Sequence, residues 1–176
     1  MRKPKPIGLS VALLIMLSVL VSLSGRSEAS PLAELKPVGN ASLKWAFWSI
    51  YDSTLYDPDG VYSGIEPGLA LHIEYRRTIR KEQLLAATRD QWQQMSIYRE
   101  PVSEIWLQEM AAIWPDVRRG DAITLKVTES LAAEFYLNGD LLGRVEDPEF
   151  TRDFLAIWLS DRSRFPSLRD QLLGGA

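Results

Sequence analysis

The chain has 176 residues, of which 46% are hydrophobic and 24% are charged, so it is long enough and apolar enough for one compact domain with a substantial core. It contains no cysteine, which excludes disulfides, thiolate nucleophiles and cysteine-based metal sites. The formal net charge is -3 and the N-terminus is cationic, so the rest of the chain is more acidic still. A nucleic-acid partner is therefore not expected, because its phosphates would require a basic surface.

The first 29 residues differ from the rest of the chain. Lysines and arginines precede an uncharged apolar run over residues 7–25, the order typical of a secretory signal peptide. Small residues just before Ser30 fit a cleavage site, so we expect residues 1–29 to be a signal peptide and residues 30–176 to form one domain. An uncleaved membrane anchor is the alternative, because roughly 20 apolar residues can span a bilayer. Both interpretations predict a periplasmic or secreted domain.

The first third of the expected domain has the pattern of β-strands. Residues 43–56, LKWAFWSIYDSTLY, are rich in aromatic residues and carry apolar side chains at both odd and even positions, which predicts one long or bulged central strand. The following DPDG at 57–60 predicts a tight turn; it lacks the remaining ligands of a calcium loop. Residues 69–79 alternate apolar and polar, as in a strand with one face on the core. The polar face carries His72, the only histidine, which we expect to be a surface residue without a metal.

The middle of the chain changes to helical spacing. Apolar side chains recur every three or four residues over 80–98 and again over 101–114, which predicts two amphipathic helices. Bulky apolar residues at this spacing are typical of a buried stripe. We therefore expect the tryptophans of these helices to belong to the core rather than to a ligand site.

The last third of the chain returns to strands and ends in helices. Residues 118–129 predict a turn and a strand, and the pair Asn138-Gly139 predicts a tight hairpin turn between two further strands. Asp147 is placed to cap a third helix, with Pro148 in its first turn, and a short fourth helix is expected over residues 166–173. Strands, two helices, three strands and two helices indicate an α+β fold, a largely antiparallel sheet with helices on one face.

Four stretches of the chain resemble the bacterial chalcone isomerase-like proteins: FWSIYDSTLYDPDG, GDAITLKV, AEFYLNGDLLGRVEDPEF and FLAIWLSDRSRFPSLRDQLLG. The resemblance covers nearly the whole expected domain and depends on the order of these motifs. It implies an open-faced β-sandwich in which helices cover a long antiparallel sheet and leave an apolar cleft between the layers. In that family, plant members close a flavonoid ring in the cleft, while relatives without this activity bind fatty acids.

The resemblance also allows a comparison with the catalytic residues of the plant enzymes. Those enzymes use an arginine after a glycine on an early strand, a threonine on the next, a tyrosine and an asparagine at the first long helix, and a threonine on a later helix. The early segment here, VGNASLKW, has no arginine, and the other positions fall at or near Tyr51, Glu82, Arg89 and Ile157. Without the cation and the hydroxyl groups, a developing oxyanion loses its stabilising donors. Flavonoid cyclisation is therefore not expected, and no catalytic residue or cofactor is predicted.

The leading hypothesis is a non-catalytic extracytoplasmic protein that binds a small apolar or amphipathic molecule, a fatty acid being one candidate. Tyr51, Tyr75 and Arg76 are the predicted ligand-binding residues, because the Arg76 guanidinium has the fork geometry that a carboxylate prefers. Alternatively, all three are ordinary residues of the sheet surface. Contact with a membrane is expected only through an uncleaved signal.

Two other classes of function stay open from the sequence. One is an isomerase or intramolecular lyase with a divergent active site, in which Glu82 would act as a base if burial raised its pKa. The other is a protein-interaction module of the cell envelope, which would require a large exposed apolar patch.

Overall fold

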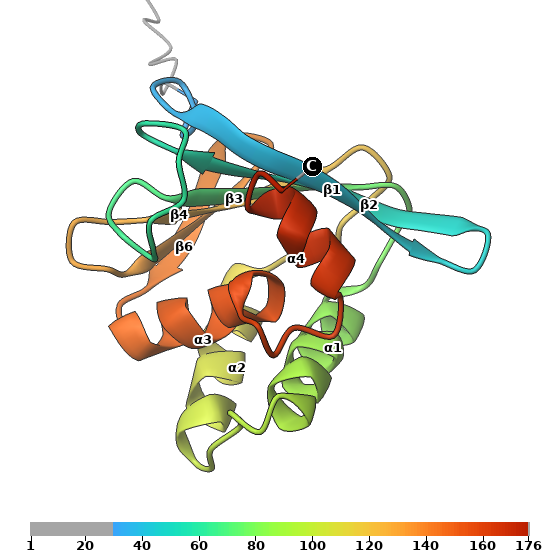
Figure 1. Ribbon diagram of the computed structural model, residues 1–176. Coiled ribbons are helices and arrows are strands. Elements are labelled where there is room, and N and C mark those ends of the chain that lie inside the picture. Colours follow the sequence, from blue (N-terminus) through green and yellow to red (C-terminus); the bar gives the residue numbers. More distant parts are fainter. Residues whose placement is uncertain (1–29, 176) are drawn as a thin grey trace, which may run out of the picture.

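The computed structural model describes residues 30–175 (Figure 1). The expected signal peptide, residues 1–29, lies outside the described residues. The described residues form six strands and four helices in the order β1 (Lys36–Trp45), β2 (Trp48–Asp57), β3 (Ala70–Tyr75), α1 (Lys81–Gln94), α2 (Val102–Ile113), β4 (Ala122–Val127), β5 (Ala133–Leu137), β6 (Asp140–Val145), α3 (Pro148–Leu159) and α4 (Pro166–Leu172).

The strands form one antiparallel sheet in which the spatial order follows the chain, β1-β2-β3-β4-β5-β6. Figure 1 shows the helices gathered on one side of this sheet, with α4 running close to β1. Side chains alternate between the two faces of a strand, so every second residue meets the helices. On β3, for example, Leu71, Ile73 and Tyr75 are buried. The α+β class and the open-faced arrangement predicted from the sequence are confirmed.

The prediction of one long central strand over residues 43–56 was wrong. The chain reverses within this stretch at Ala46 and Phe47, and Trp45 pairs with Trp48 across the hairpin. β1 is an edge strand rather than a central one. The turn residues are Ala and Phe, so the usual Gly, Asn or Asp signal of a tight hairpin is missing. Ala46 takes the positive φ, 53°, that such a residue would normally supply. Apolar residues at both odd and even positions therefore reflect a change of direction with exposed aromatic side chains, not a strand covered on both faces.

The β5-β6 hairpin and its junction with α3 form as predicted. Asn138 and Gly139 both take positive φ values, 53° and 98°, and connect the paired residues Leu137 and Asp140. The Asp147 carboxylate accepts a hydrogen bond of 2.9 Å from the Glu149 N–H at the start of α3. Its second oxygen accepts from the Trp106 indole at 3.1 Å, so this cap also joins α3 to α2.

The tryptophans of the first two helices are core residues, as expected. Trp92, Trp106 and Trp114 are all buried, and the Trp92 ring meets the Trp106 and Phe150 rings edge to face. Trp92 also donates a 2.9 Å hydrogen bond to the backbone carbonyl of Asp153 on α3. The buried cluster of the described residues extends from Ala41 to Leu172, so a protein that begins at Ser30 contains all of it.

The polar features singled out in the sequence are structural. The turn at 57–60 closes with a hydrogen bond from the Gly60 N–H to the Asp57 carbonyl. His72 lies half-buried, and its Nδ1 is 2.9 Å from the Thr124 hydroxyl on β4. Burial lowers the pKa of His72, and the Glu74 carboxylate opposes this effect. Within residues 30–175 no three histidine or acidic side chains are grouped so that they could hold a metal ion. In the same range, no helix has the length and apolar character needed to cross a membrane.

Candidate ligand cavity

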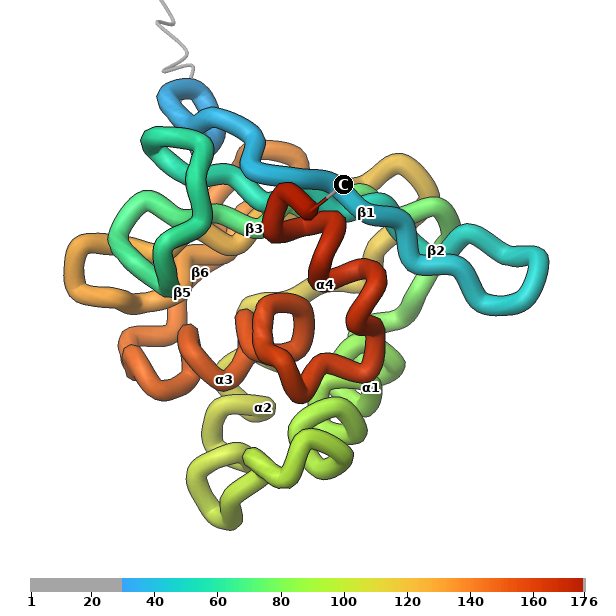
Figure 2. The backbone as a smooth tube through the Cα atoms, in the orientation of Figure 1, coloured from blue at the N-terminus to red at the C-terminus, as the bar shows by residue number. Residues whose placement is uncertain are grey.

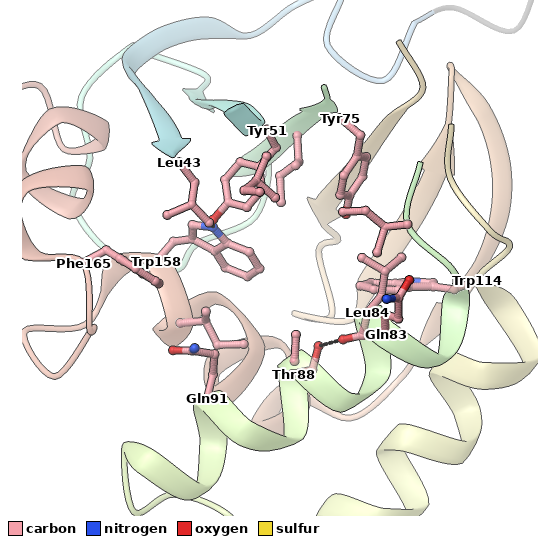
Figure 3. A pocket seen from close by; sticks show the side chains of 15 residues that line it. Leu43, Tyr51, Tyr75, Gln83, Leu84, Thr88, Gln91, Trp114, Trp158 and Phe165 are labelled. Atoms are coloured by element: carbon pink, nitrogen blue, oxygen red, sulfur yellow. Dashed lines mark hydrogen bonds between the residues drawn. The ribbon is translucent and has the colours of Figure 1, made fainter. Parts of the chain in front are cut away.

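A cavity of about 200 Å³ lies between the sheet and the helices (Figure 3). Strands β1, β2 and β3 form one wall, and helices α1 and α3 form the facing wall. The remaining lining residues are Ile79 before α1, Trp114 at the end of α2 and Phe165 before α4. Gln83 and Ala87 on α1 are lining residues that remain exposed, and they mark where the cavity opens to solvent.

Two tyrosines from the sheet face this cavity side by side. Tyr51 on β2 and Tyr75 on β3 are directly paired in the sheet, and their rings meet edge to face with centroids 6.3 Å apart. The Tyr51 hydroxyl accepts a 2.9 Å hydrogen bond from the Trp158 indole of α3. This bond uses a Tyr51 lone pair and leaves its O–H proton free to be donated.

Burial keeps both tyrosines protonated. It raises the pKa of Tyr51 to about 12, although the hydrogen bond from Trp158 opposes the shift. The pKa of Tyr75 is also raised, first by burial and second by the neighbouring Tyr51. At neutral pH both side chains are therefore neutral hydrogen-bonding groups and not bases.

Two other lining side chains present polar atoms that are not satisfied. The Gln91 carboxamide oxygen on α1 and the Trp114 indole N–H are buried and have no hydrogen-bond partner in residues 30–175. Figure 3 shows these residues at opposite sides of the cavity. A buried polar group without a partner costs roughly 1–3 kcal/mol, so each needs an explanation. Both residues line a largely apolar space, but the two atoms themselves have almost no accessible surface, so they lie behind the cavity wall.

No residue that lines the cavity carries a charge. Arg76, predicted from the sequence to share a site with the two tyrosines, is not among the lining residues. It forms ion pairs with Asp52 and Glu74, which alternate with Tyr51 and Tyr75 along their strands and so lie on the opposite, open face of the sheet. The structure brings Tyr51 and Tyr75 together and leaves Arg76 outside.

Of the positions that correspond to the plant catalytic residues, some line the cavity and others lie outside it. Tyr51 and Ile157 line the cavity, while Glu82 is exposed in the first turn of α1 and does not. Arg89 donates two hydrogen bonds of 2.9 Å to Glu104 on α2, so its guanidinium is engaged between the helices. A general base must reach the proton that it removes. Glu82 does not reach the cavity in this arrangement.

Sequence reasoning missed Gln91, Trp114 and Trp158 as site residues. Trp114 was assigned to the core, which is correct for its ring but does not account for its N–H group. A signal was present for Gln91: it lies one turn from Thr88 and two turns from Leu84 on the apolar stripe of α1, where a carboxamide needs a buried partner.

Comparison with known proteins bears on the family and the fold of the chain. The family model described as chalcone isomerase-like matches residues 38–174. An uncharacterized protein of Haemophilus influenzae is 28% identical over 159 residues, which cover 90% of this chain and 78% of that protein. The solved structure of a fatty-acid binding protein of Arabidopsis thaliana superposes with a TM-score of 0.63 at 11% sequence identity, covering 80% of this chain and 87% of that one, and this match shows the fold alone. Since the family match extends over most of the chain, the protein belongs to the chalcone isomerase-like family.

Proposed function

We propose that the protein is a non-catalytic, extracytoplasmic binder of a small apolar or amphipathic molecule, which it holds between the sheet and the helices. The observation that carries this proposal is the largely apolar cavity itself, and the buried, unpartnered Gln91 oxygen and Trp114 N–H belong to residues of its wall. A ligand with a hydrogen-bond donor or acceptor would relieve one or both after a shift of the side chain toward the cavity, since neither atom is accessible in the ligand-free protein. The fatty-acid binding protein with the same fold lends support to a binding role.

The cavity limits the size of the ligand. Its volume of about 200 Å³ is below the roughly 300–1,000 Å³ of pockets that enclose a drug-sized molecule. The ligand is therefore either small or only partly enclosed, with the remainder extending past Gln83 and Ala87 at the opening. A long-chain fatty acid would fit in the second way.

The lining also limits the charge of the ligand. An ionised carboxylate in an apolar space needs a cation or several donors, because burial of an unpaired charge is strongly unfavourable. Arg76 does not reach the cavity, so the buried end of the ligand should be an uncharged polar group or a hydrocarbon. A carboxylate would remain at the opening.

The absence of a base in the lining supports binding without chemistry. Tyr51 and Tyr75 are protonated at neutral pH because burial raises the pKa of both. They are placed to donate hydrogen bonds to a ligand. Glu82, the base that an isomerase would require, lies outside the cavity, so no observation favours that alternative.

The extracytoplasmic location is proposed from the N-terminal sequence, where a cationic start precedes an apolar run. The intact mass of the protein recovered from the periplasmic fraction tests it. A mass that begins at or near Ser30 supports export and cleavage. Full-length protein that fractionates with the cytoplasm would contradict the proposal.

Ligand binding is tested by native mass spectrometry of protein purified without detergent, followed by extraction and identification of any bound molecule. Ala87→Phe places a bulky ring at the opening and should remove the bound molecule. Ala86→Phe is the matched control, because Ala86 is exposed on the same helix but does not line the cavity. Equal occupancy in both variants would show that the molecule binds elsewhere.

A further inference from the structure

The tip of the β1-β2 hairpin exposes an aromatic cluster that the fold does not use. Trp45, Phe47 and Trp48 have exposed fractions of 74%, 102% and 69%, although such side chains are normally at least half covered. We call these three residues the aromatic tip. In Figures 1 and 2 the cyan end of this hairpin projects beyond the helices and the rest of the sheet.

Three arginines lie beside two residues of the aromatic tip, Phe47 and Trp48. A surface depression is lined by Phe47, Trp48 and Ser49 together with three arginines, Arg76, Arg77 and Arg119. Arg76 pairs with both Asp52 and Glu74, so these three groups together carry one negative charge. Arg77 and Arg119 form no ion pair with any part of the chain from 30 to 175, so their charges remain available to an external anion.

We propose that the aromatic tip docks onto the surface of a lipid bilayer that contains anionic headgroups, with Arg77 and Arg119 against the phosphates. Trp and Phe are the side chains that settle most readily at the boundary of headgroups and acyl chains. Nearby Lys and Arg add attraction to anionic lipids. The chain as a whole is acidic, with a formal net charge of -3, so it is not attracted to an anionic bilayer overall. Attraction to such a bilayer therefore depends on local cations such as Arg77 and Arg119.

The size and shape of the aromatic tip favour a bilayer over a protein partner. Three aromatic side chains exposed to this extent offer about 500 Å² of surface, at 150–250 Å² each. A stable protein interface needs about 800 Å² from each partner. The tip is also narrow and projecting, which suits insertion into a fluid surface better than contact with a flat one.

Docking would also bring the cavity close to the bilayer. Leu43 and Ile50 line the cavity and lie on this same hairpin, each two residues from a tryptophan of the aromatic tip. An apolar ligand would then have a short path between bilayer and cavity. This consequence rests on the proposed function, whereas the docking does not.

Vesicle flotation tests the docking. The protein should begin at Ser30, because it then keeps the whole core and lacks the apolar run of residues 7–25, which would itself bind lipid. We expect flotation with vesicles of phosphatidylcholine mixed with phosphatidylglycerol, and much less with phosphatidylcholine alone. Trp45 and Trp48 are exposed and the four other tryptophans are buried, so a blue shift of fluorescence on binding reports on the aromatic tip.

Three sets of variants separate the contributions. Replacing all three residues of the aromatic tip by Ser should weaken vesicle binding at least about tenfold. Arg77→Gln and Arg119→Gln should each weaken it about fivefold. Val61→Ser with Leu141→Ser is the control, because these side chains are exposed elsewhere, and it should bind like the parent.

Several results would overturn the proposal. They are no flotation with either vesicle, equal flotation with both, or unchanged binding when the aromatic tip is replaced. A dimer in sedimentation velocity that dissociates in the tip variant, without vesicle binding by the parent, would assign the aromatic tip to contact between copies instead. Vesicle binding is measured on protein stripped of ligand, so a failure to bind vesicles would not count against the proposed ligand binding. An empty cavity, in turn, would not count against docking to the bilayer.

Discussion

Gly39 on β1 should be one of the residues least tolerant of substitution, because α4 packs against it. A Cβ at position 39 would collide with the backbone carbonyl oxygen of Gln171, and would lie 2.7 Å from the carbonyl oxygen of Leu172 and 2.9 Å from the nitrogen of Gly174. All three atoms belong to backbone and cannot rotate away. We therefore expect Gly39→Ala to displace α4 from the sheet.

The cost can be worked out from what α4 buries. Its two buried side chains are Leu168 and Leu172, and full burial of a leucine is worth about 1.5–3 kcal/mol. Loss of both should lower the free energy of unfolding by about 3–6 kcal/mol, a large part of the roughly 5–15 kcal/mol of a typical domain. Because Phe165 precedes α4 and lines the cavity, displacement should also reduce ligand occupancy.

Urea denaturation of a double-mutant cycle with Leu172→Ala measures this effect. In the parent, Leu172→Ala should cost about 2–5 kcal/mol. In the Gly39→Ala background it should cost almost nothing further, since α4 no longer packs, and the amides of α4 should lose protection from hydrogen exchange. Additivity of the two substitutions within about 0.5 kcal/mol, with α4 still protected, would refute the reasoning.

Three further substitutions test the site and the sheet. Tyr51→Phe removes the acceptor of the Trp158 indole and should cost about 1–3 kcal/mol in chemical denaturation; an unchanged midpoint would show that the bond contributes nothing. Gln91→Met removes an unsatisfied oxygen, so it should leave the ligand-free protein equally or more stable while weakening ligand binding. A less stable protein that binds its ligand as tightly as the parent would exclude Gln91 from the site. Burial lowers the pKa of His72 below its ordinary value of 6.5. The unfolded chain therefore binds the proton more readily, and the free energy of unfolding should fall as the pH decreases below about 6.5. His72→Gln should flatten this part of the pH profile, and an identical profile would show that another group is responsible.

The sequence predicted those parts of the fold that depend on local chemistry. The Asn138-Gly139 turn and the Asp147 cap form because each uses a backbone preference that a few neighbouring residues decide. The reversal at Ala46 was not predictable in this way, since Ala has no preference for positive φ and the surrounding aromatic residues favour a strand.

The residues of the candidate site were chosen from the sequence by their chemistry, and strand alternation separates them. Tyr51 and Tyr75 were assigned to one site from the sequence, and the structure pairs them across β2 and β3; their contact with a ligand stays a prediction. Arg76 was grouped with them on the basis of its chemistry, yet it follows Tyr75 directly and alternation turns its side chain to the other face. Whether the Gln91 oxygen and the Trp114 N–H find hydrogen-bond partners depends on the groups that surround them after packing. The spacing of residues along the chain does not predict those groups.

The most direct test of the binding proposal is a crystal structure of the protein purified with its own bound molecule. The account predicts electron density between the two tyrosines and α1, with an uncharged polar atom within hydrogen-bond distance of the Gln91 carboxamide or the Trp114 N–H. A cavity that contains only solvent, or a ligand whose carboxylate is held by Arg76 on the open face of the sheet, would contradict it.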